Sequence, residues 1–123
     1  FQPVPYITTY AATKAFVLSY GRAFNKELKK RRGARVLSVC PFWTKTKFFD
    51  RAIKADEDPV VKKYAVMYDP TEIAKRALRD YKRGKPVSMY GVISKLQVFG
   101  VKLMPATLAM KIWIAQQKLK GRE

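Results

Sequence analysis

Residues 9–41 read TYAATKAFVLSYGRAFNKELKKRRGARVLSVCP and join a long helical pattern to a short apolar run. Apolar side chains recur at helical spacing in the first part, at Ala11, Ala15, Leu18, Phe24 and Leu28. We therefore expect a helix over residues 9–32, ended by Gly33, a residue type common just beyond helix C-termini. Residues 36–40, closed by Pro41, predict a short buried strand.

The remaining chain continues the alternation of helices and strands. Asp-Pro pairs at 58–59 and 69–70 each predict a helix start, with Asp as the N-cap and Pro at the first helical position. The second of these helices should end at Gly84 and lead into a strand over Pro86–Tyr90. Residues 91–120 predict amphipathic helices, interrupted near Pro105.

The order helix, strand, helix, strand, helix indicates an α/β fold in which crossover helices join parallel strands. Neither strand shows the alternation of a half-exposed sheet, so both should be covered on each face. Two parallel strands do not make a stable sheet alone. We therefore expect the rest of the sheet to lie before Phe1.

Composition excludes several kinds of site. The chain has no histidine and a single cysteine, Cys40, so His-based metal sites, Ser-His-Asp triads, thiolate zinc sites and internal disulfides are excluded, and we expect no metal. This cysteine usage fits a reducing compartment, and a cytoplasmic location is expected. No stretch has the roughly 18 uncharged apolar residues that a membrane span needs.

The formal net charge of +17 suggests an anionic partner. A nucleic-acid or anionic-membrane surface is one interpretation. A solvated surface with an anionic cofactor or substrate is the other, and we favour it because the charges are spread along the chain. The densest run, Lys29–Arg32, has no aromatic residues within it to stack on bases, so no nucleic-acid partner is expected.

Tyr10 and Lys14 are the pair that points to chemistry. Four residues apart on a helix, they share one face. A nearby ammonium favours the phenolate form of a tyrosine, which can then exchange a proton with a carbonyl or alcohol oxygen. Tyr81 and Lys85 have the same spacing, but Gly84 next to Lys85 predicts that this pair spans a helix end and loses its common face.

The segment PYITTYAATKAFV, residues 5–17, resembles the active-site helix of the short-chain dehydrogenase/reductase family, whose pattern is Tyr, two small residues, Ser or Thr, and Lys. Residues 36–41 resemble the family's sixth strand, which ends in a Pro-Gly turn before a cofactor-contacting Thr. Residues 69–90 resemble its last crossover helix and seventh strand. Pro41 and Thr46 match the family's pattern after the sixth strand.

The sequence also departs from the family's pattern after this strand. Phe42 replaces the glycine of the turn, and Thr44 stands where Val or Ile is usual. Aromatic residues after the proline, with Thr46 and Lys47 behind them, resemble the branch that reduces 3-oxoacyl-CoA and 17-ketosteroids.

The resemblance implies an NAD(P)-dependent oxidoreductase that interconverts a ketone and a secondary alcohol by hydride transfer. Tyr10 would be the acid/base, and Lys14 would hold the cofactor ribose and support the phenolate. The implied cofactor contacts are Tyr10, Lys14, Pro41, Thr44 and Thr46. The implied contacts to a small apolar substrate are Phe42, Trp43 and Phe48. The choice between NAD and NADP stays open.

The resemblance also implies a division of the chain. Residues 1–90 would be the C-terminal half of a doubly wound, Rossmann-type catalytic domain, with a substrate lid over about 42–67, and residues 91–123 an amphipathic helical extension. The family's catalytic serine and glycine-rich cofactor turn would precede Phe1, so we expect the chain alone to be inactive and the full-length protein to be a homo-oligomer.

Alternatives remain open at this point. Tyr10 and Lys14 could instead be an ordinary surface pair. Trp43 and Phe48 could be core aromatics, and Cys40 could be a buried strand residue. The whole chain is also readable as a non-catalytic truncated relic or a basic membrane-surface module, with residues 91–120 in peripheral membrane contact.

Overall fold

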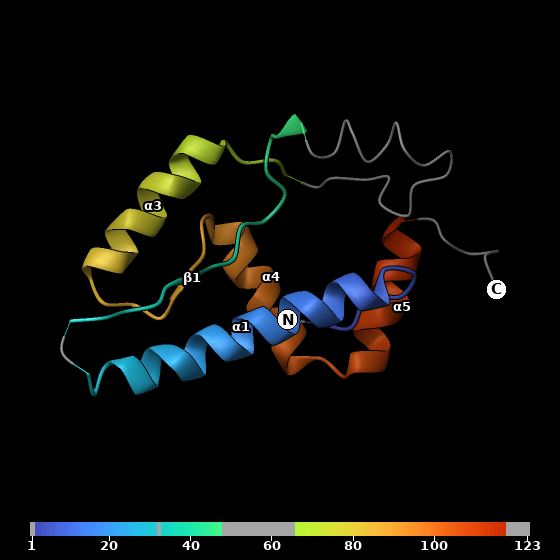
Figure 1. The fold of residues 1–123 in the computed structure, drawn as a ribbon. Coiled ribbons are helices and arrows are strands. Elements are labelled where there is room, and N and C mark those ends of the chain that lie inside the picture. The colour runs from blue at the N-terminus through green and yellow to red at the C-terminus, as the bar shows by residue number, and fades with distance from the viewer. Residues whose placement is uncertain (1, 32, 48–65, 118–123) are drawn as a thin grey trace.

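The structure is a computed structural model, and it describes residues 2–31, 33–47 and 66–117 (Figure 1). In that part of the chain, four helices accompany a small two-stranded parallel sheet, so the fold is mostly helical α/β, as the element order predicted. The elements are α1 (Thr8–Leu28), β1 (Ser38–Val39), α3 (Pro70–Lys82), β2 (Val87–Ser88), α4 (Val92–Leu103) and α5 (Ala106–Gln117).

Helix α1 ends at Leu28, earlier than the predicted boundary at residue 32. Beyond it the backbone tightens, with hydrogen bonds from Lys30 N to Glu27 O (3.1 Å) and from Arg31 N to Leu28 O (2.9 Å). Consecutive cations repel one another, which favours an early end to regular helix in this run. Gly33 has φ of 88°, in the left-handed region that glycine adopts without strain.

The two strands pair in parallel, Ser38 opposite Val87 and Val39 opposite Ser88. Ser38 N donates to Pro86 O (3.0 Å), and Cys40 N donates to Ser88 O (2.9 Å). Both strands are shorter than the predicted runs 36–40 and 86–90. The flanking prolines, Pro41 and Pro86, have no N–H to extend the ladder.

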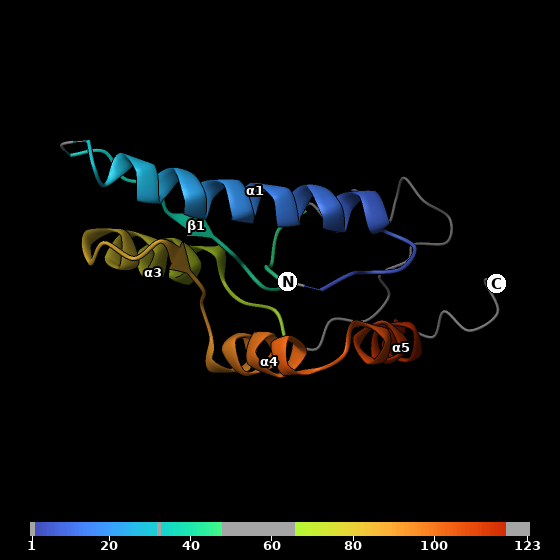
Figure 2. The same ribbon diagram turned by 90° about the horizontal axis from the view of Figure 1, so that it is seen from below.

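Helix α1 covers one side of β1, and α3 and α4 lie on the other (Figure 2). Gly21 is buried where α1 meets the strand, and a Cβ at this position would collide with the Ser38 hydroxyl. Near the helix end, the buried side chain of Asn25 accepts a hydrogen bond from Val36 N (3.0 Å). The strand backbone before β1 is therefore bound to the helix rather than to β2.

Helix α3 starts as predicted. The Asp69 side chain accepts a hydrogen bond from Thr71 N (2.7 Å), with Pro70 at the first position, and Gly84 with φ of 69° follows the helix end. The apolar residues Ile73, Ala74, Ala77, Leu78 and Tyr81 predict one buried face for this helix. Ile73 is buried as that pattern predicts, but Leu78 and Tyr81 are exposed and Asp80 is buried instead.

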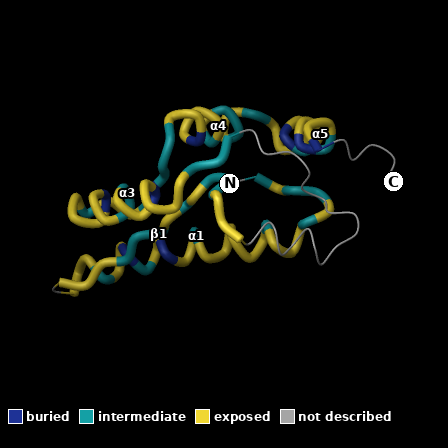
Figure 3. Tube along the Cα trace, turned by 90° about the horizontal axis from the view of Figure 1, so that it is seen from above, coloured by how far each residue is buried: buried dark blue, intermediate teal, exposed yellow. Residues whose placement is uncertain are grey.

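Helices α4 and α5 are separated at Pro105, as predicted. Among the described residues, the buried apolar ones are Ile73, Ala109 and Trp113. Figure 3 shows that most of the described trace is exposed or intermediate. None of the helices in the described ranges is long and apolar enough to cross a membrane. The predicted helix start at 58–59, Phe48, and residues 48–65 of the predicted lid lie outside the described residues.

Candidate functional site

Tyr10 and Lys14 share one face of α1, as the spacing predicted. The Lys14 ammonium nitrogen lies 5.4 Å from the centre of the Tyr10 ring, within the range of a cation–π contact. Thr13 completes this turn by donating a hydrogen bond from its hydroxyl to the Tyr10 carbonyl (2.8 Å). Both Tyr10 and Lys14 are exposed, so their polar ends are open to a ligand.

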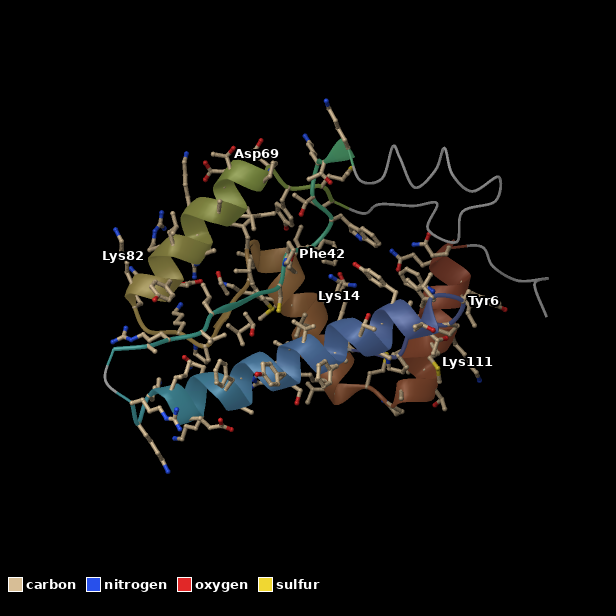
Figure 4. All side chains as sticks on the ribbon, in the orientation of Figure 1. Tyr6, Lys14, Phe42, Asp69, Lys82 and Lys111 are labelled. Carbon is tan, nitrogen blue, oxygen red and sulfur yellow. The ribbon has the colours of Figure 1, made fainter. Side chains whose placement is uncertain are left out.

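The pair opens into a groove between α1 and β1. This groove has a volume of about 520 Å³, and Tyr10 and Lys14 line it together with the backbone and side chains of residues 36–41. Figure 4 shows Lys14 on the side of α1 that faces the segment after β1, where Phe42 is labelled. Ligands of open α/β sheets bind beyond the carboxyl ends of strands, which is where the groove reaches Cys40 and Pro41.

Two contacts fix the position of this pair. Gly21 lets α1 approach β1 closely, and Asn25 binds the backbone of Val36. Both lie on α1, about three and four turns beyond Tyr10. The rigid helix therefore sets where the phenol and the ammonium stand relative to the strand end.

The aromatic residues after Pro41 pack on one another. The Phe42 ring lies edge-on to Trp43, at a centroid distance of 5.9 Å, and to Tyr68, at 6.5 Å. Tyr68 in turn meets Tyr90 edge-on at 5.2 Å. Phe42 and Trp43 thus contribute to a packed cluster and do not line the groove with Tyr10 and Lys14, although Phe42 lines a smaller cavity nearby.

The threonines lie apart from the groove. Thr44 pairs with Tyr68 in an isolated parallel bridge and donates its hydroxyl to the Phe42 carbonyl (2.9 Å). Thr46 is exposed, and neither threonine lines the groove with Tyr10 and Lys14. Of the five implied cofactor contacts, the structure brings together Tyr10, Lys14 and Pro41.

A smaller cavity of about 150 Å³ lies beyond the ends of both strands, between the segment at Cys40–Phe42 and helix α4. Met89, Gln97 and Ser94 also line it. The Ser94 hydroxyl is buried and has no hydrogen-bond partner among the described residues. Burial raises the pKa of the Cys40 thiol and favours its protonated form, although the residue is half-buried and lies just beyond β1 rather than within a buried strand.

Asp80 is the buried charged residue that sequence reasoning missed. Its carboxylate accepts hydrogen bonds from Arg76 Nε and Ser88 Oγ (both 2.9 Å) and lies 3.0 Å from Lys85 Nζ. Burial opposes ionisation, but the hydrogen bonds from these three partners outweigh it and hold the pKa of Asp80 well below its usual range. The network joins α3 to β2, away from Tyr10. The signal that could have revealed it was the Arg76–Asp80 spacing, four residues on one helix.

A basic cavity of about 850 Å³ lies near the amino ends of the strands, between the ends of α1 and α3. Its charged lining residues are Lys29, Arg31, Arg35, Lys82 and Arg83. Among the residues that the structure describes, no three His, Cys, Asp or Glu side chains are arranged to hold a metal ion.

Comparisons with known proteins add nothing to this site, since no protein-family model and no solved structure matches the chain. The arrangement itself supplies a phenol that can exchange a proton, an ammonium beside it, and a groove that reaches the carboxyl end of a parallel strand.

Proposed function

We propose that this chain carries the acid/base part of an NAD(P)-dependent oxidoreductase of the short-chain dehydrogenase/reductase type. The observation that carries the proposal is that Tyr10, Lys14 and the carboxyl end of β1 line one groove. The reaction would interconvert a ketone and a secondary alcohol. A 3-oxoacyl thioester or a 17-ketosteroid is the substrate that the resemblance of the residues after Pro41 to one branch of the family implies.

The residues of this groove fit one end of a dinucleotide. Lys14 can donate hydrogen bonds to ribose hydroxyls, and the strand end at Pro41 offers backbone groups to a flat ring. The sequence has no G-x-G-x-x-G turn for a pyrophosphate, so that end of the cofactor would need residues from outside this chain. A bound nicotinamide would supply or accept the hydride at its C4 atom.

The chain's own residues would manage the proton and the geometry. In reduction, the Tyr10 hydroxyl donates its proton to the substrate oxygen as charge develops there. The adjacent Lys14 ammonium stabilises the phenolate that remains. In the reverse direction, the phenolate accepts the alcohol proton. Phe42 and Trp43, packed edge-on just after Pro41, would offer apolar surface to the substrate.

The test is Tyr10→Phe, made in the complete open reading frame that contains this chain. We expect kcat to fall about 10²–10⁴-fold, the usual contribution of a general acid. Cofactor affinity, measured by quenching of the protein's fluorescence with NADH or NADPH, should stay within about threefold, because the phenyl ring and Lys14 remain.

The matched control is Tyr81→Phe. This tyrosine also precedes a lysine by four residues and is also exposed, but it lies at the basic cavity and not at the groove. It should leave kcat unchanged. Near-normal turnover in the Tyr10→Phe protein, or an equal loss in both variants, would refute the catalytic role.

A second candidate is a non-catalytic membrane-surface module. The exposed apolar side chains of α4 favour it over a plain truncated relic. It predicts that the complete protein shows no nicotinamide-dependent turnover with any ketone or secondary alcohol.

A further inference from the structure

Helix α4 has an apolar stripe that faces solvent. Val92, Leu96, Phe99 and Leu103 follow one another by three or four residues and are 71%, 65%, 63% and 73% exposed. Residues so spaced lie on one face of a helix. The opposite face, which includes Ser94 and Val98, packs toward the strands. The helix is therefore apolar on two sides, and only one of them is covered within the described residues.

Helix α5 also exposes apolar side chains. Leu108 and Ile112, one turn apart, are 46% and 47% exposed, while Ala109 and Trp113 are buried. Ile112 also lines a cavity of about 230 Å³ together with these two buried residues and Val101 of α4. Figures 2 and 3 both place α4 and α5 at the same level, on the side of the molecule away from α1. We call the four stripe residues of α4 the outer face: Val92, Leu96, Phe99 and Leu103.

The charges carried by α4 and α5 have one sign. Lys95 stands on an exposed position of α4 beside the stripe, and Lys111 stands on an exposed position of α5. The sequence contains no Asp or Glu between Asp80 and Glu123, so neither helix carries a carboxylate. An apolar helix face flanked by lysines, with no carboxylate on its own helix, is complementary to an interface that is apolar inside and anionic at its rim.

We propose that the outer face binds the surface of an anionic lipid bilayer, with α4 lying in the plane of the interface. The Val, Leu and Phe side chains of the outer face enter the boundary between headgroups and acyl chains, and the ammonium groups of Lys95 and Lys111 reach lipid phosphates along apolar stems. Each helix is 12 residues long, too short to span the hydrocarbon core. This inference does not depend on the proposed oxidoreductase activity, and its tests measure no turnover.

The first test measures cosedimentation of the full chain with vesicles of phosphatidylcholine, with or without phosphatidylglycerol. We expect binding to the anionic vesicles, weak binding to the neutral ones, and weaker binding as NaCl is raised. Leu96→Glu/Phe99→Glu should lower the apparent affinity at least about tenfold, because it places two carboxylates in the apolar stripe.

The matched control for that variant is Leu78→Glu/Tyr81→Glu on α3. These two residues have the same three-residue spacing, are also exposed (64% and 44%), and the change in net charge is the same. Their replacement should alter vesicle binding by no more than the general loss of charge, about threefold. Equal losses in the two double variants would overturn the proposal, because the outer face would then have no special role.

A second pair of variants tests the cationic border. Lys95→Gln/Lys111→Gln should weaken binding by about fivefold per lysine, the worth of a cation held at an anionic membrane. Lys29→Gln/Lys82→Gln removes the same charge from the basic cavity and should have a clearly smaller effect. The reverse order of these effects would assign binding to the basic cavity and overturn the outer face as the site.

An independent readout places the helix directly. Phe99→Trp should add a fluorescence signal that shifts to the blue with anionic vesicles and is quenched by lipids brominated in their acyl chains. A signal that ignores the vesicles would overturn the proposal even if the other variants fail to fold, which circular dichroism would reveal. Tighter binding to duplex DNA than to vesicles, with a steep salt dependence, would show that the partner is a nucleic acid instead.

Discussion

The buried Asp80 carboxylate binds three other side chains. It joins a neighbouring turn of α3 through Arg76, the loop through Lys85 and the strand β2 through Ser88. Arg76 and Lys85 remain partly open to water, with side chains 26% and 43% exposed. Removing the charge of Asp80 therefore leaves two cations that can hydrate, and this moderates the loss.

We predict that Asp80→Asn lowers the free energy of unfolding by about 1–3 kcal/mol at pH 7. The folded-state pKa of Asp80 is depressed, so its ionisation stabilises the fold above the unfolded-state value of about 4. Below that pH the unfolded chain binds the proton first, and the difference between the two proteins should shrink as the pH falls.

Urea denaturation followed at a series of pH values measures this difference. Glu72→Gln is the control, because it removes an exposed ion pair with Lys75 on the same helix and should leave stability nearly unchanged. A stability gap between wild type and Asp80→Asn that persists unchanged to pH 2 would contradict the assigned role of the charge.

The candidate site shows what local spacing can and cannot predict for single residues. The shared face of Tyr10 and Lys14 followed from helix periodicity, because both residues belong to one element. The positions of Thr44 and Thr46 did not follow, because a bridge to Tyr68, more than twenty residues later in the chain, directs that backbone. Asp80 was missed for the same reason, since two of its partners lie beyond the helix.

Among the elements, the contact between α1 and β1 governs the geometry of the groove. Gly21 is the point of closest approach, where a side chain would meet the Ser38 hydroxyl. Helical glycines usually reduce stability relative to alanine. Here the missing side chain is a condition of the packing.

We predict that Gly21→Ala lowers the free energy of unfolding by about 1 kcal/mol, because overpacking outweighs the gain in helix propensity. Adding Ser38→Ala should restore most of that loss, since it removes the atom that the new methyl group meets. Gly100→Ala is the matched control: a Cβ there meets nothing within 4 Å, so this change in α4 should raise stability. Chemical denaturation of the four proteins decides the matter, and a stabilised Gly21→Ala protein would show that the helix can shift away from the strand.

Element types were predictable from the sequence and element lengths were less so. The caps at Asp69 and Gly84 and the break at Pro105 use local chemistry, and the structure has all three. Strand length depends on the partner strand. Pro41 follows β1 and Pro86 precedes β2, so only a short part of each strand lies opposite the other. The buried side of α3 depends on the Asp80 network, which overrode the apolar pattern.

At the scale of the whole molecule, a small apolar core has to stabilise a chain with a large positive net charge. The described part of the chain buries few apolar side chains, while the sequence carries a net charge of +17. Like charges brought together on folding repel one another, and salt screens that repulsion. The parallel pair β1–β2 has no third strand beside it among the described residues, and the expectation of further strands is untested. The α/β class is confirmed, and the doubly wound sheet remains a prediction.

We predict that the stability of the chain rises as NaCl is raised from low to moderate concentration, because screening relieves repulsion among its cations. The urea midpoint by circular dichroism is the measurement. Lys29→Gln/Lys82→Gln, which lowers the charge at the basic cavity, should raise the low-salt midpoint and reduce its salt dependence. A midpoint that falls with salt would mean that attractive ion pairs dominate instead.

Cys40 lies at the meeting point of two hollows, since it lines both the groove beside Tyr10 and the smaller cavity beneath α4. It is also the one sulfhydryl in the sequence. Because burial raises its pKa, this thiol reacts slowly near neutral pH, so a thiol-directed dye or mass tag would be applied at alkaline pH. It would report from a single known point, and its rate of attachment would slow when a molecule in either space covers the sulfur. The labelling rate of Cys40 would therefore show whether a molecule occupies either cavity, even before a ligand has been identified.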